Sequence, residues 1–368
     1  MAAPMKFKIS NIFIFLKNAY FPRLLQINMN KNYKFYSQTF KFSGMLHLNY
    51  PQRDHNRRTQ NKKSFSLPSA GLLALIGFSK KTEEEKDELI LTLKKAKLAE
   101  KKQKFEKANR FYHKALGIAT MRHQNHEITQ DEWITKRNYI FIHMANLAFG
   151  MFKLEAAEKL FKDAMRGYLE AGLEKDDNAL VEISMKLAML YAMQEKHEEA
   201  VEGYKFAIEA QERKMSQSEV IDENTIALWG MCLDAFSKYF LTRNNYRDAY
   251  GYTERALTVA FQVFGENHPQ TATLWNDLAN ISYLMGNIDN AISQCEKAIE
   301  LGELLQIPEL AAFYCNLGSI LLHNGEFEKA FEKCTKASKL AHDRESRKQA
   351  RGCLKDIKAK KSSGNTEI

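Results

Sequence analysis

The chain of 368 residues has little proline and no cysteine cluster. Only six prolines interrupt a sequence dense in alanine, leucine, glutamate and lysine, and this composition favours helices. The five cysteines form an odd-numbered set without a CxxC pair, which argues against both a disulfide framework and a zinc site. We therefore expect an all-α protein in which cysteines such as Cys295 and Cys334 serve packing.

Catalytic motifs are also missing. The sequence has no glycine-rich phosphate loop, no GxSxG elbow and no HExxH motif. The nearest approach to a metal-ligand cluster is His113 with His123, His126 and Glu127, and polar hairpin ends often carry histidine. We predict a protein that is not an enzyme, with no catalytic residue, no cofactor and no bound metal.

Acidic residues are almost absent from the first 64 positions, which hold twelve Lys or Arg and one acid, Asp54. Subtracting these from the totals leaves 42 basic and 44 acidic residues in 65–368, so the formal net charge of +9 belongs to the leader. This distribution removes the main argument for a nucleic-acid partner. A basic stretch mixed with aromatics and serine predicts a disordered, cleaved mitochondrial targeting leader at 1–64; a secretory signal and a non-targeting extension are the alternatives.

A full membrane span is marginal in this sequence. Sixteen uncharged residues lie between Lys63 and Lys80, and as a helix they would extend about 24 Å, against a hydrocarbon core of about 30 Å. We predict that the short apolar segment at 65–80 either anchors the chain at a membrane interface or caps the exposed end of the first repeat.

Repeats organise the rest of the chain. One pattern recurs six times. An alanine is followed four positions later by a residue that is usually aromatic or cysteine, and three positions after that by a second alanine. The six copies are Ala108/Tyr112/Ala115, Ala157/Phe161/Ala164, Ala200/Tyr204/Ala207, Ala249/Thr253/Ala256, Ala291/Cys295/Ala298 and Ala330/Cys334/Ala337. Twelve residues before each first alanine is a small anchor residue: Ala96, Ala145, Ala188, Ser237, Ala279 and Gly318. Two antiparallel helices approach closely where such small side chains meet, so the pattern predicts six helical hairpins.

The hairpin pattern resembles the tetratricopeptide repeat. The first alanines lie 39 to 49 residues apart, longer than the usual unit of about 34, so some helices or loops must be extended, as in the polar stretch "QERKMSQSEVIDENT". We predict a right-handed superhelical solenoid of about six hairpins at 87–345, followed by a capping helix and polar tail at 346–368.

Solenoids bind partners mainly through the concave face, which the first helices of the hairpins line. Counting from the small anchors predicts a peptide groove with a flexible methionine floor flanked by amides, suited to an apolar helix or an extended peptide. Its residues are Tyr139, Ile142, Asn146, Phe149, Met185, Met189, Met193, Asn276, Asn280 and Tyr283. The alternative is that a long inter-repeat helix covers this floor.

Longer strings are more specific than the repeat pattern. "MANLAF", "AEKLFKDAM", "DNALVEISMKLAMLYA", "GMCLDA" and "GENHPQTATL", with the basic leader and apolar segment, resemble the mitochondrial tetratricopeptide repeat protein 19 family over about residues 87–345. The resemblance implies a non-enzymatic inner-membrane factor that associates with respiratory complex III, cytochrome bc1. It also implies a role in clearing N-terminal fragments of the Rieske iron-sulfur subunit. The implied partners are complex III subunits and the inner membrane, with no nucleic acid and no small-molecule substrate.

One string supports a different class of function. "GENHPQT" also resembles kinesin light chain, which favours a cytosolic cargo or peptide adaptor as the alternative. Such an adaptor would need a heptad coiled coil before its repeats, and residues 1–80 contain none.

Overall fold

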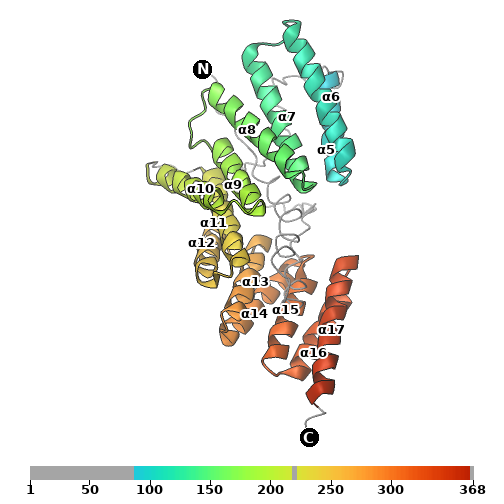
Figure 1. Cartoon of the computed structure of the whole chain (residues 1–368). Helices are drawn as coiled ribbons and strands as arrows, with labels where there is room; N and C mark the ends of the chain where they lie inside the picture. The colour runs from blue at the N-terminus through green and yellow to red at the C-terminus, as the bar shows by residue number, and fades with distance from the viewer. Residues whose placement is uncertain (1–86, 218–221, 365–368) are drawn as a thin grey trace, which may run out of the picture. The chain divides into compact units, whose positions relative to one another are not determined.

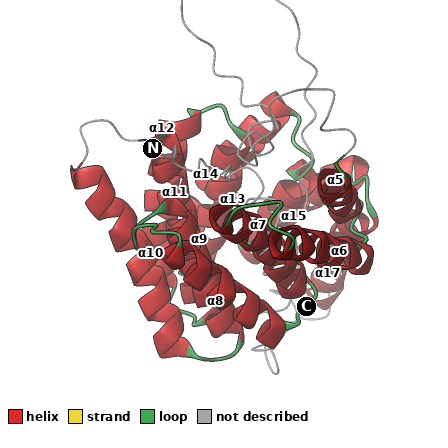
Figure 2. Cartoon of the chain, turned by 90° about the horizontal axis from the view of Figure 1, so that it is seen from above, coloured by secondary structure: helices red, strands yellow, loops and turns green. Residues whose placement is uncertain are grey.

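The computed structural model describes residues 87–217 and 222–364 (Figure 1). Within these ranges every regular element is a helix, and short loops join consecutive helices into antiparallel hairpins (Figure 2). The helices fall into two compact units, 87–177 and the part from 178 onward. The expected leader at 1–64 and apolar segment at 65–80 lie outside the described residues.

The first unit contains two hairpins. Its helices are α5 (Glu88–Lys101), α6 (Phe105–Gln124), α7 (Gln130–Gly150) and α8 (Leu154–Glu170). Asp87 caps α5 by accepting from the backbone N–H of Leu89 at 2.7 Å, and Thr129 with Glu132 forms a capping box at the start of α7. The local sequence therefore marks where both first helices begin.

The second unit contains four hairpins and a final helix. Its helices are α9 (Asn178–Met193), α10 (His197–Gln217), α11 (Glu223–Thr242), α12 (Tyr246–Phe264), α13 (Pro269–Leu284), α14 (Ile288–Leu305), α15 (Leu310–His323), α16 (Phe327–Leu340) and α17 (Arg344–Gly364). The extra length of the third repeat lies partly in α10, because that helix continues through the polar stretch to Gln217.

The repeat pattern has the expected structural role. Both alanines of every copy are at most 2% exposed, and so are the anchors Ala96, Ala145, Ala188, Ser237 and Ala279. These small side chains let the two helices of each hairpin pack closely. The prediction of six tetratricopeptide-type hairpins is confirmed.

The central position of each second helix differs along the chain. In the first three hairpins it holds a fully buried aromatic ring, from Tyr112, Phe161 or Tyr204. In the fourth it holds Thr253, whose hydroxyl lies 2.6 Å from that of the anchor Ser237. In the last two it holds Cys295 and Cys334. A smaller side chain fills less of the core, so other groups must occupy that space.

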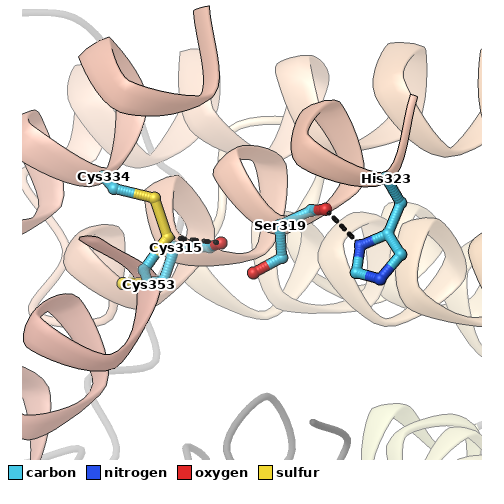
Figure 3. The surroundings of a disulfide bond; sticks show 5 residues. All are labelled: Cys315, Ser319, His323, Cys334 and Cys353. Atoms are coloured by element: carbon cyan, nitrogen blue, oxygen red, sulfur yellow. Dashed lines mark hydrogen bonds between the residues drawn. A yellow bond between two sulfur atoms is a disulfide. The ribbon is translucent and has the colours of Figure 1, made fainter. Parts of the chain in front are cut away.

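In the sixth hairpin the space is filled from α17. The structure joins Cys334 of α16 to Cys353 of α17 by a disulfide, with Cα atoms 5.9 Å apart (Figure 3). The expectation that the cysteines serve packing is therefore wrong for this pair, because α17 packs back on α16 and brings the two side chains together. A Cβ atom at Gly318 would lie 2.5 Å from the Cys334 sulfur, so the bridge also requires glycine as the anchor.

Candidate functional site

The predicted groove residues belong to both units. Tyr139, Ile142, Asn146 and Phe149 lie on α7 in the first unit. Met185, Met189 and Met193 lie on α9, and Asn276, Asn280 and Tyr283 lie on α13, in the second unit. We therefore describe the two sets separately.

The three methionines are not an open floor. Met185, Met189 and Met193 are 0%, 2% and 8% exposed, and thirteen of the sixteen residues of α9 are buried. A helix that is apolar around its whole circumference is buried on all sides, so counting one face as open was wrong for α9. Peptide binding by these residues stays a prediction.

In the first unit the residues around Tyr139 form a compact polar and aromatic cluster. The ring of His143 stacks on Tyr112 with centroids 5.4 Å apart and meets Tyr139 edge-on at 4.5 Å. The Tyr112 hydroxyl donates to Glu100 Oε2 at 2.8 Å, and Lys97 Nζ lies 3.0 Å from Nδ1 of His143. Glu100 Oε2 also lies 3.8 Å from that nitrogen, so Lys97 and Glu100 both face the His143 ring.

Burial and the nearby carboxylate keep both phenols of this cluster neutral. Burial, followed by the charge of Glu100, raises the pKa of Tyr112 well above its usual value. The same two causes raise the pKa of Tyr139. Tyr112 is fully buried and belongs to the hairpin core, whereas Tyr139 is half-buried. Neutral phenols are poor nucleophiles, so the cluster gives no support to nucleophilic chemistry.

In the second unit charged side chains of α11 and α13 lie together. Lys238 Nζ is 2.6 Å from Asp234 Oδ2, four residues earlier on α11. Burial alone would lower the pKa of Lys238, but the carboxylates of Asp234 and of Asp277 on α13 outweigh it and raise that pKa. The ammonium thus stays charged, and carboxylates from successive first helices hold it.

Two further pairs continue this arrangement along the first helices. On α9, Lys186 Nζ lies 2.5 Å from Glu182 Oε1, and both side chains are buried. On α15, the amide of Asn316 donates to Asn276 Oδ1 of α13 at 2.8 Å. The first pair lies within one helix, whereas the second connects two neighbouring repeats.

These side chains occupy matching positions in successive repeats. Some lie two or three residues before the small anchor of their helix and others one residue after it, so they share one side of each first helix. We call this set the polar row: Lys186, Asp234, Lys238, Asn276, Asp277, Asn280 and Asn316. Of these residues the sequence analysis named only Asn276 and Asn280; the same counting from the anchor Ser237 leads to Asp234 and Lys238.

Other chemistry has little support in the described part of the chain. The thiol of Cys315 is buried, which raises its pKa to about 12 and makes it a poor nucleophile at neutral pH. Among residues 87–217 and 222–364, no three His, Cys, Asp or Glu side chains are placed to hold a metal ion. No helix in those ranges is both long and apolar enough to cross a membrane.

Comparison with known proteins agrees with this fold. Residues 272–301 and 311–343, the fifth and sixth hairpins, match the Tetratricopeptide repeat family. A solved structure of BtubC (BKLC) from P. vanneervenii is 21% identical with a TM-score of 0.52, covering 64% of this chain and 90% of that one. At this identity the likeness shows the fold alone.

Two curated relatives are closer in sequence. Human mitochondrial tetratricopeptide repeat protein 19 is 35% identical over 290 residues, covering 76% of this chain and 74% of the human protein. The Danio rerio protein of that name is 38% identical over 264 residues, covering 68% of this chain and 63% of its own. Both relatives are named mitochondrial, and the repeat fold is that of a protein-interaction adaptor. The chain belongs to the tetratricopeptide repeat protein 19 family.

Proposed function

We propose that this chain is a non-enzymatic factor of the inner mitochondrial membrane that binds respiratory complex III and supports its assembly or maintenance. Membership of a family whose relatives are named mitochondrial is the observation that carries the proposal. The fold adds a surface for protein partners, because the paired charges of Asp234 and Lys238 on the first helix α11 are only half-buried. The role would be exerted through N-terminal fragments of the Rieske iron-sulfur subunit, which the protein helps to clear.

The polar row gives this proposal a physical basis. A processed fragment is an extended chain whose backbone N–H and C=O groups need partners. The three asparagines of the polar row are at most 7% exposed, so the partners that the row can offer are the half-buried charged side chains of Asp234, Lys238 and Asp277. Side chains of this kind hold backbone groups with little dependence on sequence, as a factor that handles several fragments requires.

The string that favours the alternative, a cytosolic adaptor like kinesin light chain, has a structural role in this chain. The string "GENHPQT" forms the turn between α12 and α13: Gly265 has φ 81°, His268 caps α13 and Pro269 is at its first turn. Thr271 Oγ1 then donates to the Gly265 carbonyl at 3.0 Å. These four residues thus have a local structural role, and the string by itself does not specify a cargo.

The test is affinity purification of the tagged protein from gently solubilised mitochondria, with co-purifying subunits identified on a native gel. Complex III should be recovered, and Rieske N-terminal fragments should accumulate when the protein is absent. Recovery of motor subunits, or failure to enter mitochondria, would reject the proposal in favour of the adaptor.

A pair of aspartate variants then tests the surface. Asp277→Asn removes a half-buried carboxylate of the polar row from α13, whereas Asp289→Asn removes an exposed carboxylate from the second helix α14. We expect fragment capture to fall about tenfold for Asp277→Asn, which is about 1.4 kcal/mol, and to stay unchanged for Asp289→Asn. Equal capture by both variants would exclude the polar row while leaving the complex III role untouched.

A further inference from the structure

The final helix carries a charge opposite to that of the rest of the folded chain. α17 contains eight Lys or Arg and two acids, a net of +6. Residues 65–343 contain 34 basic and 41 acidic residues, a net of −7. Positive charge is therefore concentrated in one helix at the end of the second unit.

The charges of α17 share one face. Arg344, Lys348, Arg351, Lys355 and Lys358 are exposed and follow one another at spacings of four and three, which places them in a stripe along the helix. We call these five residues the cationic stripe. From Arg344 to Lys358 the helix rises about 21 Å, so the stripe is a straight row of five positive charges.

The opposite face of α17 is occupied. Ser346, Gln349, Ala350, Cys353 and Ile357 are buried, and the helix packs on α15 and α16. The disulfide from Cys353 to Cys334 and the ion pair from Lys361 to Glu328, at 2.9 Å, attach the helix to α16. The stripe is thus held on a fixed support, and no apolar face of this helix is available to insert into a bilayer.

We propose that the cationic stripe binds the surface of a membrane rich in anionic lipid headgroups, by electrostatic attraction and without insertion. Each Lys or Arg near such a surface strengthens binding by about fivefold, and this attraction falls off within a Debye length. A straight row of charges suits a flat surface, because all five can approach the headgroups together. This inference rests on the proposed function for its choice of the inner membrane as the surface.

A nucleic-acid partner fits the stripe less well. Sites for single-stranded nucleic acid combine positive charge with aromatic rings on which bases stack, and α17 contains no aromatic residue. The acidic excess of residues 65–343 would also repel a polyanion that extended beyond the helix.

Vesicle binding by the full chain tests the proposal with two matched triple variants. Lys348→Gln, Arg351→Gln and Lys355→Gln neutralise the centre of the stripe. Lys94→Gln, Lys95→Gln and Lys101→Gln remove the same charge from exposed positions of α5. The N-terminal segment is present in all three proteins, and circular dichroism checks that each remains helical.

The vesicles contain phosphatidylcholine with or without about one third phosphatidylglycerol, at 50 and 300 mM salt. We expect the α17 variant to lose at least tenfold in binding to anionic vesicles at low salt, and the α5 variant less than threefold. A photoactivatable anionic lipid should cross-link to α17 peptides of the unmodified protein, and high salt should abolish these cross-links. These vesicles contain no complex III, so their result is separate from the co-purification test.

Three results would overturn the proposal. Equal losses in the two variants would show attraction to net charge rather than to the stripe. Cross-links confined to other segments, with unchanged binding of the α17 variant, would remove the stripe from the contact. Displacement of the protein from vesicles by a short RNA that binds the α17 variant weakly would identify nucleic acid as the partner.

Discussion

The first four hairpins and the last two build the same turn from different residues. In each turn one residue adopts the left-handed conformation: Gln103, Phe152, Glu195 and Asn244 in the first four, Gly286 and Gly325 in the last two. Only glycine adopts this conformation without steric cost. The two hairpins with glycine are the two that match the Tetratricopeptide repeat family.

The hairpins also differ at the core, where the fourth stands apart because it holds Thr253. The first three hairpins bury an aromatic ring at the centre of the second helix, whereas the last two bury cysteine. Large rings contribute more buried apolar area per hairpin, which offsets an unfavourable turn. In these five hairpins stability is placed in the core or in the turn, and the family pattern recognises the second kind. The fourth hairpin has neither feature, since Asn244 is in its turn and Thr253 in its core.

The largest expected effect comes from removing a core ring. Phe161→Ala should lower the free energy of unfolding by about 3–5 kcal/mol, because it leaves a cavity at a fully buried site. Cys295→Ala at the matching position of the fifth hairpin removes one sulfur atom and should cost about 1 kcal/mol. Urea denaturation measures both, with hydrogen exchange of the α7 and α8 amides for Phe161→Ala and of the α13 and α14 amides for Cys295→Ala. Similar losses would mean that the rings are not what distinguishes the first hairpins.

The disulfide should have the next largest effect. Cys353→Ala opens a covalent loop that joins positions 19 residues apart, and a loop of this length is worth about 3 kcal/mol. Reductant should destabilise the unmodified protein by a similar amount and leave the variant unaffected. Non-reducing peptide mapping detects the Cys334–Cys353 linkage directly. If reductant left the melting temperature unchanged and peptide mapping found Cys334 and Cys353 as free thiols, the disulfide would be contradicted.

The hairpins could be predicted from the sequence because their signal is local. Small residues at fixed spacing determine where two helices touch, and the aligned alanines are all buried. The turns were harder to predict, because Phe152 and Glu195 adopt the left-handed conformation without the glycine that usually indicates it. The spacing of small residues identifies the fold but not the family, and the longer strings identified the family.

The candidate site depends on contacts between helices, and the sequence predicted these contacts less well than the hairpins. Counting from the anchors found Asn276 and Asn280 but treated the methionines of α9 as accessible, although that helix is buried on all sides. Likewise, Cys334 and Cys353 meet only because α17 packs back on α16. Periodicity specifies one helix face and says nothing about which helix returns to cover it.

Adding a side chain to a glycine turn isolates the cost of the turn conformation. Gly286 has φ 82°, and a Cβ there would meet no atom within 4 Å, so Gly286→Ala should lower stability by about 1–2 kcal/mol through backbone strain alone. Gly251→Ala is the matched control, since that position on α12 is helical and equally open, and there alanine should stabilise by up to about 1 kcal/mol. Urea denaturation measures the two variants side by side, and changes of the same sign would contradict the role of the turn.

The reverse exchange should give the smallest effect and the sharpest test of the comparison. Glu195 is exposed with φ 62°, so Glu195→Gly should relieve strain and raise stability by about 0.5–1 kcal/mol, making the third turn like the last two. Glu202→Gly makes the same chemical change at an exposed position inside α10, where glycine should cost about 1 kcal/mol. Opposite shifts of the urea midpoint at unchanged slope would place the difference in the turn. A loss in both variants would show that the first hairpins accept the left-handed residue without strain, and only the core would then separate the two groups.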